Sequence, residues 1–294
     1  MSPAPGSSSA ALESPLGTGL RRSVGMFRAF LVEQSDPDTF YRTQAVDTLA
    51  QVARHMDLDG RLVIDIGGGA GYFSEAFRGA GARSYLVEPE AGVAVAGALA
   101  PEDAQQRAHA EAVRPGRLVP GATVAGDGYH LPFPSGLADL TFSSNVLEHV
   151  PAAEPFLSEM VRVTRPGGLL YLSFTAWFSP WGGHETSPWH YLGGRRAAAR
   201  YERVNRRPPG NLYGQSLFAQ HVGPVLRLAR SRTDLDILEA IPRYYPAWLD
   251  WLVKVPGLRE LATWNLLLVM RRRPTARARP TAKPTVTAPG MVRP

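Results

Sequence analysis

The chain has 294 residues, of which 44% are hydrophobic and 20% charged, and it contains no cysteine. This composition is typical of a globular protein, and the lack of cysteine excludes disulfides, thiolate metal sites and cysteine nucleophiles. The net charge of +6 does not indicate a nucleic-acid-binding protein, because the stretch from Arg271 onward carries seven basic and no acidic residues, while the rest carries 25 basic and 26 acidic residues.

Residues 1–20 are predicted to form a disordered leader, which lacks the basic start and apolar stretch of a signal peptide. No apolar run is long enough to span a bilayer, so we expect a cytoplasmic protein. A first helix is predicted over residues 35–56, because Ser35 and Asp36 can cap it and Pro37 suits its first turn.

Predicted strands and helices then alternate along the chain. Strands are expected over residues 61–66, 83–88, 138–146, 168–175, 234–244 and 264–272. Helices are expected over residues 72–81, 91–100, 152–164 and 216–232, with a turn over 165–168 and two short helices between residues 245 and 263. This alternation predicts an α/β fold with a parallel sheet covered on both faces, whose last strand forms a hairpin-like edge.

The C-terminal stretch 274–294 is rich in proline and threonine and is predicted to be a disordered basic tail. Such a tail either aids solubility or binds an anionic surface such as lipid. The aromatic segment "YYPAWLDWLVKV" (244–255) lies shortly before it and either packs against the sheet or docks at a membrane surface.

The segment "VIDIGGGAG" (63–71) carries the clearest functional signal. A strand runs into a turn that contains Gly67, Gly68, Gly69 and Gly71, and a helix follows. Glycine is needed where the backbone takes a positive φ or approaches a ligand closely, and the N-terminus of the next helix offers free N–H groups. The alternative is a tight turn without a ligand.

Carboxylates follow the same edge of the predicted sheet. Asp65 precedes the glycines, whose G-x-G-x-G spacing differs from the G-x-G-x-x-G of dinucleotide-binding folds, and it favours a ligand with positive charge. Glu88 ends the next strand, where a carboxylate can accept both hydroxyls of a ribose. Asp127, in "GDGYHLPFPSG", can accept from an exocyclic amine, and the apolar "LPFP" can form a wall for a purine.

These three segments in this order resemble class I S-adenosylmethionine-dependent methyltransferases, of the broad group that includes quinone-biosynthesis methyltransferases. "ADLTFSSNVLEHV" and "RVTRPGGLLYLS" also match, so the resemblance covers residues 60–176 strongly. It implies a Rossmann-like, doubly wound, mostly parallel seven-stranded sheet with an antiparallel last strand, in a domain over residues 21–273. Thirty of the 32 basic residues are arginine, which is typical of GC-rich, actinobacterial genomes.

The resemblance also implies roles in binding S-adenosyl-L-methionine. The glycine turn, with Gly67, Gly69 and Gly71, would pass under the methionine and ribose part of the cofactor, and Asp65 would orient its amino-acid end. Glu88 would accept the ribose hydroxyls. Asp127 would accept the adenine amine with help from the backbone of Gly128, and the carbonyl of Asn145 would lie near the cofactor's ammonium group.

A metal site is not predicted. Some relatives bind a divalent ion through E-x-x-E-H, but here Asn145 occupies the first position, before Glu148 and His149. Neutral asparagine is a weak ligand for such a site. We expect Glu148 and His149 to open the next helix instead.

The connection over residues 177–215 is too long for a minimal domain and is predicted to be a substrate lid. Its segment "WGGHETSPWHYLGG" offers aromatic walls, and His184 or, second, His190 could deprotonate an acceptor. Either histidine could instead only hold the loop together. Six arginines follow, which form either a solvated face or a site for an anionic acceptor: Arg195, Arg196, Arg200, Arg203, Arg206 and Arg207.

The predicted activity is methyl transfer to a small-molecule or glycolipid acceptor, with a hydroxyl as the favoured target. One alternative is a protein or RNA methyltransferase, although the fourth strand ends in "SSNV" and not in the Asn-Pro-Pro-aromatic motif of nucleic-acid enzymes. We expect no nucleic-acid partner. The other alternative is a non-catalytic cofactor-binding protein, which the retained glycines and Glu88 disfavour.

Overall fold

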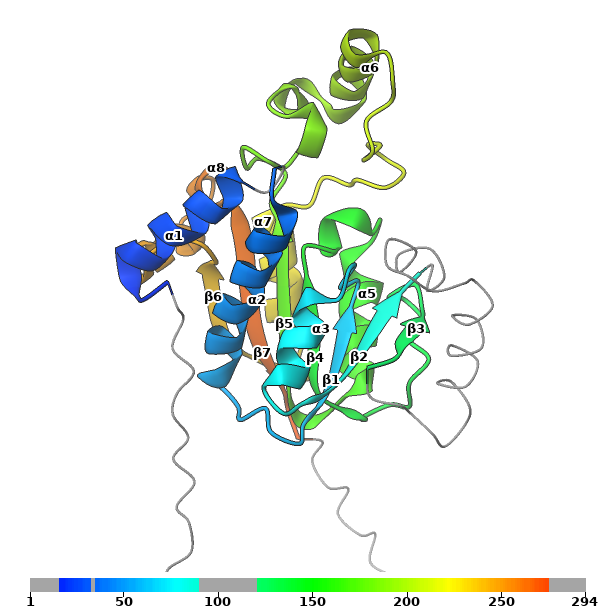
Figure 1. Cartoon of the computed structure of the whole chain (residues 1–294), viewed down its shortest axis with the longest axis vertical. Coiled ribbons are helices and arrows are strands. Elements are labelled where there is room, and N and C mark those ends of the chain that lie inside the picture. Colours follow the sequence, from blue (N-terminus) through cyan, green and yellow to red (C-terminus); the bar gives the residue numbers. More distant parts are fainter. Residues whose placement is uncertain (1–15, 33–34, 90–120, 275–294) are drawn as a thin grey trace, which may run out of the picture.

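A computed structural model describes residues 16–32, 35–89 and 121–274. The helix predicted over 91–100, and most of the predicted leader and tail, lie outside these residues. The described chain forms one seven-stranded sheet in the order β3-β2-β1-β4-β5-β7-β6, with helices on both faces (Figure 1). This confirms the Rossmann-like doubly wound fold.

The strands of the sheet are β1 (Leu62–Ile66), β2 (Arg83–Glu88), β3 (Thr123–Ala125), β4 (Ala138–Ser144), β5 (Thr164–Thr175), β6 (Leu235–Pro242) and β7 (Asn265–Arg272). The α-helices are α1 (Gly19–Leu31), α2 (Pro37–Ala53), α3 (Tyr72–Gly79), α5 (Ala153–Val163), α6 (Gly194–Asn205), α7 (Val222–Ser231) and α8 (Leu258–Ala262). Short 3₁₀ helices are η1 (Leu147–His149), η2 (His184–Thr186), η3 (Trp189–Leu192) and η4 (Ala247–Lys254).

One strand of the described sheet, β7, runs opposite to the others. Strands β1 to β5 pair in parallel, whereas β7 inserts between β5 and β6 and runs antiparallel to both. The predicted antiparallel last strand is therefore confirmed. Parallel strands place their carboxyl ends at one edge of the sheet, where doubly wound folds bind ligands.

Two local predictions differ from the structure. The short strand β3 was not anticipated, since three residues carry little periodicity. The predicted turn over 165–168 lies inside β5, because Thr164 already pairs with Ala138 before Leu169 pairs with Leu140. The segment between these pairs is a bulge, with Gly167 at a φ of 78°.

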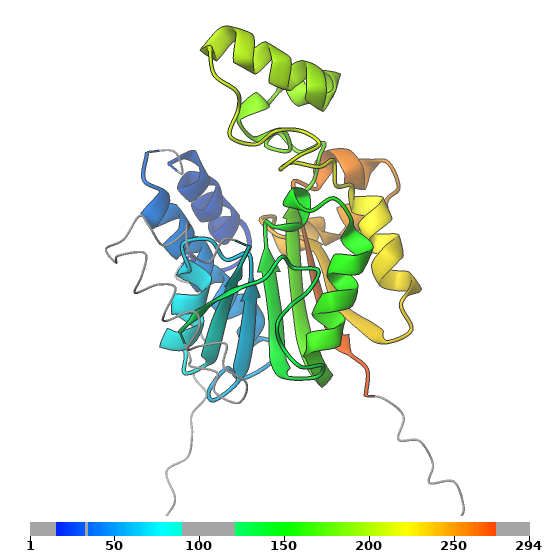
Figure 2. The same ribbon diagram turned by 90° about the vertical axis from the view of Figure 1, so that its right-hand side faces the viewer.

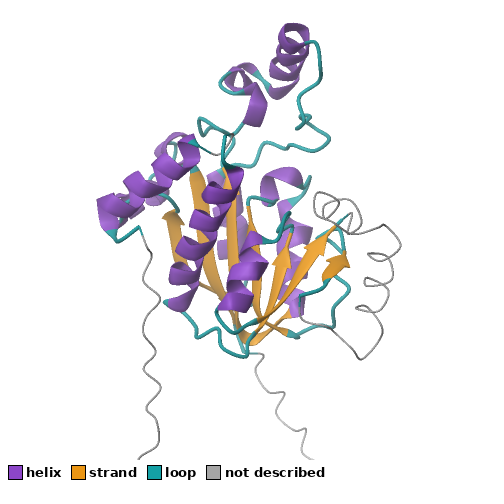
Figure 3. Cartoon of the chain, in the orientation of Figure 1, coloured by secondary structure: helices purple, strands orange, loops and turns teal. Residues whose placement is uncertain are grey.

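Two hydrophobic clusters lie on opposite faces of the sheet. Helices α2 and α3 pack on one face, where Val63, Phe77 and Phe142 are buried. Helices α5 and α7 pack on the other face, where Ile64 and Phe156 are buried. Figures 2 and 3 show the helical layers on either side of the strands. Burial on both faces explains why these strands are continuously apolar.

The two N-terminal helices precede the sheet. Helix α2 begins as predicted, with Pro37 at its first turn and the Asp36 carboxylate accepting from the Thr39 N–H at 3.1 Å. Helix α1 was not predicted. It packs on α2 and is anchored by Arg22, whose guanidinium binds the buried Asp47 carboxylate at 2.6 Å.

The predicted lid lies between β5 and α7. It contains η2, η3 and α6, and α6 makes its contacts chiefly with η2 and η3. Figures 1 and 2 show α6 standing clear of the sheet, beyond its carboxyl edge. Among the described residues, no helix is long and apolar enough to cross a membrane.

Candidate active site

The glycine turn joins β1 to α3 at the carboxyl edge of the sheet. Gly67, Gly69 and Gly71 have φ values of 71°, 57° and 84°, which other residues rarely adopt. A Cβ atom on Gly67 would also lie 2.5 Å from the Val146 side chain. The turn therefore needs glycine both for its backbone shape and for its close approach to the segment after β4.

Asp65 lies beneath this turn and is fully buried. Its Oδ2 accepts a hydrogen bond from the Ser74 hydroxyl at 2.8 Å, while Oδ1 has no partner among the described residues. A Cβ atom on Gly68 would lie 2.5 Å from Oδ2. Burial raises the pKa of Asp65 to about 7, and the Glu88 carboxylate adds to the rise. A positively charged group of a ligand at the turn would therefore stabilise the ionised form of this carboxylate.

Glu88 ends β2 beside the same turn. Its Oε1 accepts from the backbone N–H of Gly69, which ties the glycine turn to the next strand. Burial raises the pKa of Glu88, and this hydrogen bond partly opposes the rise. The role of Glu88 in accepting ribose hydroxyls stays a prediction.

Asp127 lies in the loop after β3. Its Oδ1 accepts from the backbone N–H groups of Tyr129 and His130 at 2.8 and 2.7 Å, and Oδ2 lies 3.1 Å from His130 Nδ1. Burial raises the pKa of Asp127, but these hydrogen bonds outweigh burial and lower it. At Gly128, with a φ of 75°, a Cβ atom would lie 2.7 Å from the Phe156 ring. The local bonds hold Asp127 ionised at the loop surface.

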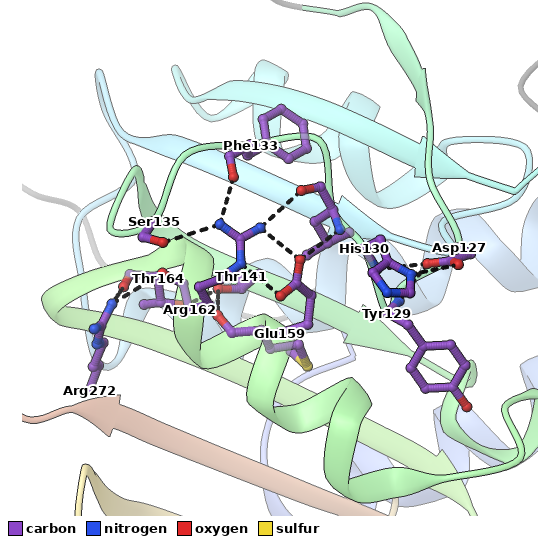
Figure 4. A network of polar contacts seen from close by, with 12 residues as sticks. Asp127, Tyr129, His130, Phe133, Ser135, Thr141, Glu159, Arg162, Thr164 and Arg272 are labelled. Atoms are coloured by element: carbon purple, nitrogen blue, oxygen red, sulfur yellow. Dashed lines mark hydrogen bonds and ion pairs between the residues drawn. The ribbon is translucent and has the colours of Figure 1, made fainter.

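A clamp formed by Arg162 and Glu159 of α5 holds the loop after β3 in place (Figure 4). The Arg162 guanidinium binds the Glu159 carboxylate at 2.7 Å and donates to the carbonyls of Leu131 and Phe133 at 2.9 Å. Glu159 in turn accepts from the Leu131 N–H at 2.7 Å. Leu131 and Phe133, two residues of the predicted purine wall, are buried in the core and line neither cavity, so the structure gives no support to a purine wall at these positions.

A cavity of about 260 Å³ joins these elements. Its polar lining residues are Glu88, Asp127, Asn145 and His149, and Gly67 and Gly128 also line it. Five predicted cofactor residues thus line one hollow, whereas Gly68, Gly69 and Gly71 do not line it and Asp65 is buried behind the turn. The individual ligand contacts of these residues stay predictions.

A second, larger cavity of about 870 Å³ lies next to the first. Its walls are largely aromatic and include Phe30, Phe40, Trp181, Tyr244, Tyr245 and Trp264. Asn145 and His149 line both cavities, so the two meet at the end of β4. Asn145 has a φ of 57°, and its side-chain oxygen accepts from the Asn265 amide at 2.7 Å.

Polar groups gather where the cavities meet. Glu148, His149 and His184 each offer one atom within 4.8 Å of the others. The Glu148 carboxylate is buried, which raises its pKa. Burial and the nearby His149 lower the pKa of His184 to about 4, so its imidazole is neutral near pH 7. The structure places Glu148 and His149 in the short helix η1, ahead of α5, and brings His184 of the lid to them.

His190 is placed differently from His184. It is fully buried inside the lid, does not line either cavity, and has Nε2 3.2 Å from the Ser179 carbonyl and Nδ1 3.3 Å from the Ser187 hydroxyl. The expectation of a catalytic base has no support at this position, because both ring nitrogens are engaged. Its ring packs against Trp177, so this geometry supports the structural alternative.

The lid's aromatic residues also divide. Trp181 lines the large cavity, whereas Trp189 and Tyr191 are more than 40% exposed. Arg200 of α6 lies over the Trp189 ring at 3.9 Å. None of the six lid arginines lines either cavity, so these cavities give no support to an anionic acceptor site at the arginines.

Several cavity residues were missed at the level of sequence. Helix α1 contributes Val24, Phe27 and Phe30 to the wall. The spacing of Leu20, Val24, Phe27 and Leu31 is helical and could have revealed α1. Tyr244 and Trp264, by contrast, reach the cavity only through the path of β6 and β7, which no local pattern shows.

Comparisons with known proteins agree with this geometry. A family model described as a methyltransferase domain matches residues 64–172. A protein described as an uncharacterized methyltransferase of Mycobacteroides abscessus is 44% identical over 261 residues, which cover 86% of this chain and 95% of that protein. A methyltransferase of Mycobacterium tuberculosis is 44% identical over 257 residues, covering 85% and 94%.

Solved structures were also compared. The crystal structure of an S-adenosylmethionine-dependent methyltransferase from Mesorhizobium loti is 20% identical and aligns with a TM-score of 0.47, covering 76% of this chain and 96% of that one. The sequence relatives, which span nearly the whole domain, establish the family. The chain therefore belongs to the methyltransferases.

Proposed function

We propose that this methyltransferase O-methylates a hydroxyl of an apolar small molecule or of a lipid-linked acceptor such as a glycolipid. One observation carries the proposal: Asn145 and His149 line both the cofactor-side cavity and the large aromatic cavity. A hydroxyl held in the large cavity at this junction would face the cofactor side directly.

The residues around the smaller cavity fit the cofactor. The Asp65 oxygen that has no hydrogen-bond partner within the described residues, together with the carboxylates of Glu88 and Asp127, suits S-adenosyl-L-methionine, which carries an ammonium group, ribose hydroxyls and an adenine amine. When bound, the cofactor supplies a methyl group activated by its sulfonium. The protein's own contribution is to hold the donor at the glycine turn and to shield the junction from water.

The walls of the large cavity indicate an apolar acceptor. Aromatic side chains line its sides, whereas its polar groups concentrate at the junction with Glu148, His149 and His184. An acceptor with a hydrophobic body and one polar end matches this distribution. Each imidazole nitrogen that is not donating could accept the proton of the acceptor hydroxyl.

Exposed apolar side chains near the cavity favour a lipid-linked acceptor. Phe27 of α1 lines the cavity and is 44% exposed, and Trp248 and Trp251 of η4 are also exposed beside the lining residue Leu249. Such a rim suits entry of a lipid from a membrane surface. We therefore retain peripheral membrane contact and a cytoplasmic location as part of the proposal.

The test uses methyl-labelled cofactor and an actinobacterial extract. Wild-type protein is compared with Glu88→Ala, which removes the ribose-binding carboxylate and should abolish labelling. Alkali-stable label in an organic-phase product supports a hydroxyl acceptor on an apolar molecule. Alkali-labile label would indicate a carboxylate acceptor, and label in precipitated protein or RNA would favour a macromolecular substrate; either result overturns the proposal.

A further inference from the structure

We propose that Glu148, His149 and His184 bind a divalent first-row transition-metal ion, such as Zn²⁺, at the junction of the two cavities. The three residues come from two separate segments, η1 and the lid, and their candidate ligand atoms all lie within 4.8 Å of one another. The sequence predicted no metal because Asn145 replaces a carboxylate, and the spacing could not show that His184 joins the other two.

His149 is oriented as metal-binding histidines usually are. Its Nδ1 lies 2.7 Å from the Ser216 carbonyl oxygen, so Nδ1–H donates there and Nε2 carries the free lone pair. In metal sites the second ring nitrogen characteristically donates to a carbonyl or carboxylate, which fixes the tautomer. The Ser216 carbonyl provides that support from the end of the lid.

The other two residues leave buried atoms without partners. Glu148 is 2% exposed, and its Oε1 accepts from the Thr175 N–H at 3.1 Å. Its Oε2 and the Nε2 of His184 have no hydrogen-bond partner among the described residues. Burying a carboxylate oxygen and an imidazole nitrogen without partners is costly, and a cation between them would satisfy both.

Neighbouring groups in the described structure do not replace that cation. No hydrogen bond joins Oε2 of Glu148 to either imidazole, so the cluster is not a carboxylate–histidine dyad. The buried Arg243 donates instead to the hydroxyls of Ser144, Ser173 and Thr48. Its charge acts on Glu148 only at a distance, and the pair forms no ion pair within the described residues.

The ligand set decides the kind of metal. Two imidazoles and one carboxylate suit Zn²⁺ and other first-row transition metals, whereas Mg²⁺ and Ca²⁺ prefer all-oxygen sites. Three protein ligands leave at least one coordination position open, as in catalytic zinc sites. With both imidazoles coordinated, the ion and not a free imidazole would activate an acceptor hydroxyl; this role rests on the proposed function, but metal binding itself does not.

The direct test is titration of the metal-stripped full chain with ZnCl₂ by calorimetry, and with CoCl₂ by visible absorption. We expect one ion to bind per chain. The Co²⁺-loaded protein should show visible absorption bands typical of Co²⁺ coordinated by imidazole nitrogen. His184→Ala and Glu148→Gln should each weaken Zn²⁺ binding at least tenfold. The control is His55→Gln, which alters another histidine–glutamate pair, with Nε2 2.9 Å from Glu239, and should bind Zn²⁺ like wild type.

Thermal unfolding separates a lost ligand from a lost fold. Zn²⁺ should raise the melting temperature of wild type and His55→Gln but not of Glu148→Gln. Without metal, Glu148→Gln should melt at or above the wild-type temperature, because the variant no longer buries a carboxylate at position 148. Absence of saturable binding, or unchanged affinity in His184→Ala, would refute the site. If the protein binds metal but does not methylate a hydroxyl, only the proposed function is refuted. If it binds no metal and still methylates a hydroxyl at the full rate, only the metal site is refuted.

Discussion

At the scale of single residues, the buried Asp65 carboxylate lowers the folding stability of the protein when it is ionised. The carboxylate is fully buried next to the glycine turn, and burial raises its pKa from 3.8 to about 7. In the unfolded chain the group ionises near its ordinary value. Between about pH 4 and 7 the folded protein therefore holds more protons than the unfolded chain, so stability falls as the pH rises through this window.

We predict that Asp65→Asn removes this pH dependence. One pKa unit corresponds to about 1.4 kcal/mol. Without cofactor, the stability of Asp65→Asn relative to wild type should therefore be roughly 2–4 kcal/mol greater at pH 8 than at pH 4. Urea unfolding at the two pH values measures the difference. Glu154→Gln, an exposed carboxylate on α5, serves as the control. An equal stability difference at both pH values would contradict the buried ionisation.

The same substitution should weaken cofactor binding. One buried carboxylate oxygen of Asp65 has no hydrogen-bond partner in the described part of the chain, and its charge would stabilise an ammonium group near the turn. We expect the dissociation constant of S-adenosylmethionine to rise about tenfold in Asp65→Asn, equivalent to about 1.4 kcal/mol. Calorimetry of the full chain measures it; unchanged affinity would mean that Asp65 serves only to shape the turn.

At the scale of elements, the loop after β3 depends on α5 for its shape. Arg162 and Glu159 bind the backbone of Leu131 and Phe133 (Figure 4). This clamp lies outside the smaller cavity and holds the loop that also carries the lining residue Asp127. Glu159 has a lowered pKa, because the hydrogen bond from Arg162 favours its ionised form. The loop's sequence alone does not reveal this dependence.

Arg162→Ala should therefore impair cofactor binding from a distance. Loss of the guanidinium leaves two carbonyls and a carboxylate without their donor, and we expect a several-fold rise in the Michaelis constant for S-adenosylmethionine and about 1–3 kcal/mol of destabilisation. Arg165→Ala is the matched control, since Arg165 pairs with Asp139 at 2.7 Å at the start of β5. Equal effects of both substitutions on the Michaelis constant would refute a specific positioning role.

At the scale of the whole molecule, the large cavity exists only because distant parts of the chain meet. Helices α1 and α2, the start of the lid and the segments around β6 and β7 each supply part of its wall. The Phe30 ring joins two of them, since it packs against Phe40 at 5.5 Å and against Trp181 of the lid at 4.3 Å. The cavity proposed to hold the acceptor is thus formed jointly by the N-terminal helices, the lid and the segments around β6 and β7.

Phe30→Ala should therefore affect the acceptor and spare the cofactor. Loss of two aromatic contacts and part of the wall should raise the Michaelis constant for the acceptor about tenfold. The dissociation constant for S-adenosylmethionine should stay unchanged, because α1 does not line the smaller cavity. Leu31→Ala, on the same helix but 66% exposed, provides the control. A parallel loss of cofactor affinity would show that the two cavities are not independent.

Much of the cofactor side was determined by the sequence alone. The glycine turn, the carboxylates at the strand ends and the succession of β1, β2, β4, β5 and β7 along the chain follow from local backbone requirements and from periodicity, whereas the antiparallel last strand was implied by the family resemblance. These features are encoded within a few neighbouring residues, which is why their signals survive without any knowledge of packing. The place of the lid in the chain, between β5 and α7, was also visible as an unusually long connection.

Only the tertiary structure decided the acceptor side. It buried His190 within the lid, brought His184 to Glu148 and His149, and used α1 as a cavity wall. Each of these outcomes depends on which segments pack together, and the spacing of residues along the chain carries no information about that. Local physics therefore specifies the glycine turn and the carboxylates of the predicted donor site, while long-range packing specifies the shape of the large cavity beside it.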